Sequence, residues 1–198
     1  MALCGPRWDW YLSKPVQRLP GTRPPVSSRT RGAVWFAAIS AIATITLLPK
    51  SIIPALRDAA TPKKGFFGKP KDKYPAVLAQ HGREVERYVW SGYVLATLLP
   101  SLKNARKIDL MKSEFADLSS LLTEARGATV LVLDAGHKHW LSELDPAKFS
   151  EQELRDRFNQ FNAANEPDAG RWMLDGVRFL QQALSQVQAD EIGLLVIG

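Results

Sequence analysis

The chain has 198 residues and a mass of 22.0 kDa, and its 26 Lys and Arg residues exceed its 20 Asp and Glu residues to give a net charge of +6. Hydrophobic residues make up 45% of the chain, which excludes a wholly disordered or fibrous protein. The one cysteine, Cys4, excludes an internal disulfide framework and a cysteine-rich zinc module.

The charge and the prolines are unevenly distributed about Lys107. Residues 1–107 hold 18 Lys and Arg residues, 5 acids and eleven prolines, a net charge of +13. Residues 108–198 hold 8 Lys and Arg residues and 15 acids, a net charge of −7. A basic half therefore precedes an acidic half, and the basic half indicates an anionic partner, either lipid head groups or nucleic acid.

Residues 1–32 form a basic arm that is rich in proline. Proline fixes φ and lacks an amide donor, so the five prolines of this arm exclude a long helix. Aromatic residues interleave with the arginines, a composition that also suits single-stranded nucleic acid. The arginines predicted to contact anionic lipid or nucleic acid are Arg18, Arg23, Arg29 and Arg31.

Residues 33–56 are predicted to form a membrane-anchor helix. Residues 33–48 carry no charge, and extension to Leu56 gives a helix of roughly 36 Å, enough to cross a ~30 Å hydrocarbon layer. The alternative is a helix buried in a protein core. Basic residues are balanced on the two sides, so a cytoplasmic N-terminus is only the default for this membrane protein, whether single-pass or peripheral. The predicted anchor side chains are Trp35, Phe36, Ile39, Ile42, Ile45, Leu47 and Leu48.

Residues 57–75 read as a basic linker that contains two adjacent phenylalanines. Lysines and aromatic rings together suit an anionic membrane surface, and a flexible solvated linker is the alternative. The lysines predicted to contact lipid or nucleic acid are Lys63, Lys64, Lys69, Lys71 and Lys73.

Residues 76–198 are predicted to form one helix followed by a small α/β domain. Apolar spacing of three and four residues predicts helices over 76–99 and 113–126, one that opens at Ser150, and one that carries the stripe from Met173 to Val187. The apolar runs 128–133 and 192–197 predict buried strands, and 107–111 a weaker one.

This order of elements predicts an α/β fold: a small, mostly parallel, three-layer sheet domain in the C-terminal half, preceded by the extended basic arm and one or two apolar helices. The last strand runs to the end of the sequence. An edge left open there predicts a partner chain, unless the helix at 76–99 covers it.

Asp134, His137 and His139 form the one candidate for chemistry. Asp134 follows a strand, and in an extended chain His137 and His139 project to the same side. The three could ligate a metal with Glu143 or Asp145, or Asp134 could orient His137 as a general base. The alternative is an ordinary loop with two exposed histidines.

The leading hypothesis is a non-enzymatic, membrane-anchored subunit of a larger assembly. Its basic half faces anionic lipid, and its acidic α/β half docks other protein subunits on its surface or sheet edge. No cofactor and no small-molecule substrate is predicted. One alternative is a soluble or peripheral α/β enzyme with its site at Asp134, His137 and His139, and another is a nucleic-acid-binding subunit that uses the basic aromatic arm.

Overall fold

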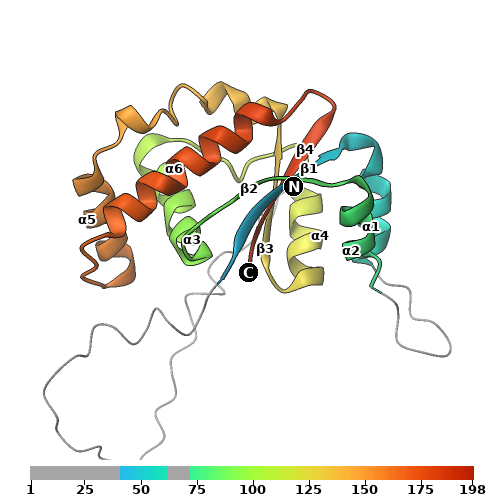
Figure 1. The fold of residues 1–198 in the computed structure, drawn as a ribbon, viewed down its shortest axis with the longest axis horizontal. Coiled ribbons are helices and arrows are strands. Elements are labelled where there is room, and N and C mark those ends of the chain that lie inside the picture. Colours follow the sequence, from blue (N-terminus) through green and yellow to red (C-terminus); the bar gives the residue numbers. More distant parts are fainter. Residues whose placement is uncertain (1–40, 62–71) are drawn as a thin grey trace, which may run out of the picture. The chain divides into compact units, whose positions relative to one another are not determined.

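The computed structural model describes residues 41–61 and 72–198. Residues Ile39–Gly198 form one compact unit, built on a four-stranded sheet with helices on both of its faces (Figure 1). The strands are β1 (Ala43–Pro49), β2 (Arg83–Arg87), β3 (Thr129–Asp134) and β4 (Glu191–Ile197). Their order across the sheet is β2-β1-β4-β3, and every neighbouring pair is antiparallel.

The prediction of a mostly parallel sheet is therefore wrong, although the α/β class holds. Two helices, α5 (Glu151–Asn162) and α6 (Ala169–Gln186), connect β3 to β4. A single crossover helix brings the chain back to the end of the sheet where the preceding strand began, so the next strand runs parallel to it. The pair α5 and α6 instead brings the chain back to the end where β3 stops, so β4 runs antiparallel to β3. Asp134 consequently pairs with Ile192, and β4 runs back along β3.

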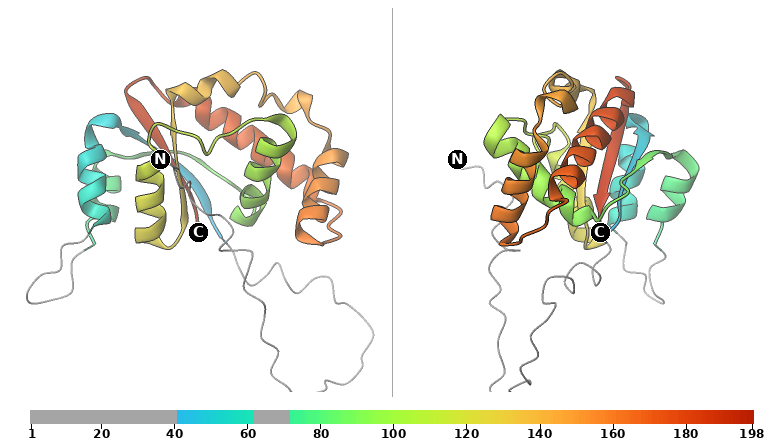
Figure 2. Two further views of the ribbon diagram at one scale, coloured as in Figure 1. Left: turned by 180° about the vertical axis from the view of Figure 1, so that it is seen from behind. Right: turned by 60° about the vertical axis from the view of Figure 1, so that its left-hand side comes forward.

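Side chains alternate between the two faces of the sheet, as the period of a strand requires. One face packs against α3 (Gly92–Ser101) and α6, and α5 packs against these two helices (Figure 2). The buried strand residues on this face are Ala43, Ile45, Leu47, Leu131, Leu133, Leu195 and Ile197.

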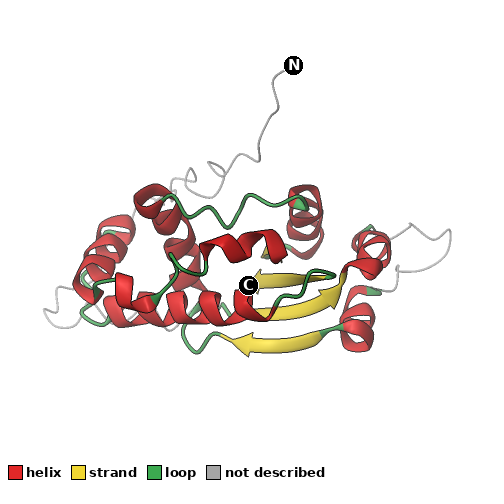
Figure 3. Cartoon of the chain, turned by 90° about the horizontal axis from the view of Figure 1, so that it is seen from above, coloured by secondary structure: helices red, strands yellow, loops and turns green. Residues whose placement is uncertain are grey.

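The opposite face packs against α1 (Ile53–Ala60), α2 (Tyr74–His81) and α4 (Ala116–Arg126). Its buried strand residues are Leu48, Val130, Val132, Ile192 and Leu194. The strands consequently lie between two groups of helices, as Figure 3 shows from above. Burial on both faces explains why β3 and β4 read as continuous apolar runs.

The predicted membrane-anchor helix and the single-pass membrane location are also wrong. The described part of residues 33–56 forms β1, a short 3₁₀ turn (Lys50–Ile52) and the start of α1. No helix among the described residues is long and apolar enough to span a bilayer. Thr44 and Thr46 alternate with buried residues, a period of two that belongs to a strand. Of the predicted anchor residues, Ile45, Leu47 and Leu48 are buried, Ile42 is exposed, and Trp35, Phe36 and Ile39 lie outside the described residues.

The helix predicted over 76–99 is three elements, α2, β2 and α3. Gly82 ends α2 in an extended conformation, and an added Cβ there would lie 2.7 Å from the Thr46 methyl group. Only glycine therefore lets the chain pass this close to β1. The strand predicted over 107–111 is a turn that follows a short π-helix, η3 (Leu102–Arg106).

Other local predictions are confirmed. Gly127 ends α4 in the left-handed conformation, with φ at 63°. The Ser150 side chain caps α5 by accepting a hydrogen bond from the Glu153 amide. The last strand, however, lies inside the sheet between β1 and β3, so the sheet edges are β2 and β3.

The two sheet edges are blocked in different ways. The Thr123 hydroxyl of α4 accepts from the Val130 amide at 3.0 Å and donates to the Val130 carbonyl at 3.2 Å. The Ser119 hydroxyl accepts from the Val132 amide at 2.9 Å. The β2 edge instead carries four charged residues in five and a register shift, two features that oppose strand addition.

Candidate functional site

Asp134 is a nearly buried carboxylate at the carboxyl end of β3. It accepts from the Ser113 hydroxyl at 2.9 Å and from the Gly136 amide at 2.7 Å. It caps a 3₁₀ helix, η4 (Ala135–Trp140), which begins at once after the strand. These bonds supply the polar partners that a buried carboxylate requires.

His137 is 3% exposed and its Nδ1 accepts from the Asp134 amide at 3.1 Å. That amide points outward from the β3 edge, and the ring nitrogen takes the place of a strand carbonyl. An accepting Nδ1 places the proton of the neutral ring on Nε2. Nδ1 also lies 3.2 Å from Asp134 Oδ1, but in this tautomer it has no proton to donate to the carboxylate.

This geometry indicates that His137 has a structural role, holding η4 against the end of β3, and is not a general base. Asp134 could orient His137 as a base only by accepting a hydrogen bond from a protonated Nδ1, and that would leave the buried Asp134 amide without an acceptor. His137 Nε2 is buried and has no hydrogen-bond partner among the described residues. The Ser113 hydroxyl donates to Asp134 and not to the His137 ring, so Ser113 and His137 do not form a nucleophile–base pair.

His139 does not join His137. Positions two apart on a 3₁₀ helix point in different directions, whereas the sequence prediction assumed an extended chain. The His139 ring lies against Trp140 at 4.3 Å, and its Nδ1 is 2.5 Å from the Gly136 carbonyl oxygen. In residues 41–61 and 72–198, no group of three His, Cys, Asp or Glu residues is placed to hold a metal ion.

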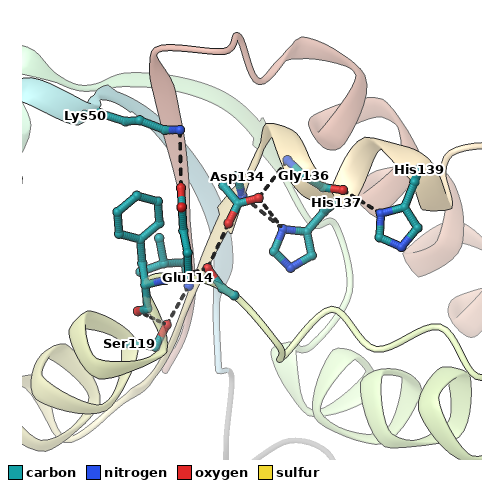
Figure 4. A network of polar contacts seen from close by, with 10 residues as sticks. Lys50, Glu114, Ser119, Asp134, Gly136, His137 and His139 are labelled. Carbon is teal, nitrogen blue, oxygen red and sulfur yellow. Dashed lines mark hydrogen bonds and ion pairs between the residues drawn. The ribbon is translucent and has the colours of Figure 1, made fainter.

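The polar network continues from Asp134 into α4 (Figure 4). Ser113 accepts from the Phe115 amide at 3.0 Å, and the Phe115 carbonyl accepts from Ser119 at 3.3 Å. Glu114 pairs with Lys50 at 3.4 Å, which ties the loop to the end of β1. The cluster thus joins β3, η4 and the start of α4.

Most of the residues predicted to bind lipid or nucleic acid fall outside the part of the chain that the structure describes. Lys73 is described: it is exposed and precedes the first turn of α2. The residues outside are Arg18, Arg23, Arg29, Arg31, Lys63, Lys64, Lys69 and Lys71.

A second feature, which the sequence analysis missed, lies where β1 begins and β2 ends. The four exposed large hydrophobic residues of the described chain are Val89 (79% exposed), Phe161 (52%), Tyr93 (46%) and Ile42 (45%). The backbone brings them to one end of the domain: the Gly92 amide donates to the Ala41 carbonyl at 2.7 Å, next to Ile42 and Tyr93.

The C-terminus of α5 adjoins the same place. The Tyr93 hydroxyl donates to Asn162 Oδ1 at 2.5 Å, which brings Phe161 to the start of α3. Trp90 lies half-buried beside them, its ring 5.9 Å from that of Trp172 on α6. We call Ile42, Val89, Trp90, Tyr93 and Phe161 the apolar end.

No protein-family model, no curated protein and no solved structure matches this chain.

Proposed function

We propose that the domain is a non-enzymatic, protein-binding subunit of a larger assembly, and that its partner docks on the apolar end. The observation that carries the proposal is that the four exposed large hydrophobic residues of the described chain adjoin the hydrogen bonds that link the start of β1, the start of α3 and the end of α5. Single exposed apolar residues scattered over a surface need no explanation, but a group of them marks an interaction site.

The composition of the apolar end supports a protein partner. Tryptophan, tyrosine and arginine are the residues that carry most of the binding energy in protein interfaces. The apolar end holds Trp90 and Tyr93, and the guanidinium of Arg171 lies 5.2 Å above the Trp90 ring. The two blocked sheet edges favour this surface over strand addition.

The test is photo-cross-linking of the full-length protein in its own cells. Phe161 is replaced by p-benzoylphenylalanine, a photoreactive derivative of the same residue, and Ala125 on α4 is replaced likewise as the control. Ala125 is exposed, and α4 covers the opposite face of the sheet. We expect one protein adduct, formed from position 161 and not from position 125.

The adduct must also depend on Val89. Burial of this side chain in a complex stabilises it by about 1.5 kcal/mol or more, so Val89→Asp should lower the adduct yield at least about tenfold. Ala125→Asp adds the same charge elsewhere and should leave the yield unchanged. Adducts only to lipid, adducts only within residues 1–40 of the same chain, or no position-specific adduct would refute the proposal.

A further inference from the structure

We draw no further inference here: the strongest candidate, the buried side-chain cluster of Asp134 and His137 at the carboxyl end of β3, where His137 Nε2 has no hydrogen-bond partner among the described residues, belongs to the site already described, and the described part of the chain places no set of ligating side chains there that could hold a metal ion.

Discussion

Thr123→Val is the sharpest test of how α4 blocks the β3 edge. Valine matches threonine in shape and in helix propensity, so the change removes only the hydroxyl. That hydroxyl forms hydrogen bonds with the backbone amide and the backbone carbonyl of Val130, a residue that is only 1% exposed. The variant leaves a buried amide and a buried carbonyl without their partner.

Each unsatisfied buried group costs about 1–3 kcal/mol. Thr123 itself is half-buried, so water can reach part of the site. We therefore expect the two groups together to lower the free energy of unfolding by an amount near the low end of this range, about 2 kcal/mol. For a domain of this size the melting temperature should then fall by about 4–8 °C. The Val130 amide should also exchange its hydrogen faster, because the loss is local to the edge.

Differential scanning calorimetry and native-state hydrogen exchange measure both effects. Thr123→Ser keeps the hydroxyl and should stay close to the wild-type protein. Ser120→Ala removes a hydroxyl of the same helix that bonds only to the Ala116 carbonyl, and it is the matched control. A Thr123→Val protein as stable as Ser120→Ala, with unchanged exchange at Val130, would refute the reasoning.

Two further predictions concern packing and pH. In Gly170→Ala the new Cβ would lie 2.1 Å from the Glu151 carbonyl oxygen, so urea unfolding should show that the free energy of unfolding falls by about 2 kcal/mol or more. Gly127→Ala is the control: no atom lies within 4 Å of its new Cβ, so only the positive φ costs stability, about 1 kcal/mol. Equal losses in the two variants would contradict this prediction. The Arg57 guanidinium holds the pKa of Asp117 below its usual range, so this pair stabilises the fold above the unfolded pKa, and the contribution is lost as pH falls through the lower folded pKa. Arg57→Gln should raise the pKa of Asp117 in an NMR titration, and an unchanged value would contradict this assignment.

The elements α4, α5, α6, β3 and β4 of the acidic half could be predicted because each carries a complete local signal, whereas the strand predicted over 107–111 is a turn. The stripe from Met173 to Val187 lies on a helix buried along one face, and Ser150 and Gly127 mark helix ends by their own chemistry. The direction of the strands could not be predicted, since it depends on how α5 and α6 pack together.

The basic half was misread because an uncharged run has no polar face to reveal its period. Residues 41–49 carry no charge because β1 is an inner strand covered by helices on both faces. Only the alternation of Thr44 and Thr46 with Ile45 and Leu47 indicated a strand.

The Asp134 cluster could be predicted only in part. Asp134 and His137 come together because η4 begins at once after β3, whereas His139 turns away on the same helix. Ser119 and Thr123, four residues apart on α4, are a sequence signal for a hydroxyl-lined helix face beside a strand. The apolar end had no such signal, because its residues come from four separate places: just before β1, just after β2, α3 and α5.

The central claim is that the apolar end docks another protein. The most direct measurement is the cross-link from p-benzoylphenylalanine at position 161 in full-length protein, with and without Val89→Asp. We predict one partner protein in the adduct, in a yield that falls at least about tenfold in the variant. An adduct that forms equally well with Val89→Asp, or no protein adduct from this position, would contradict the claim.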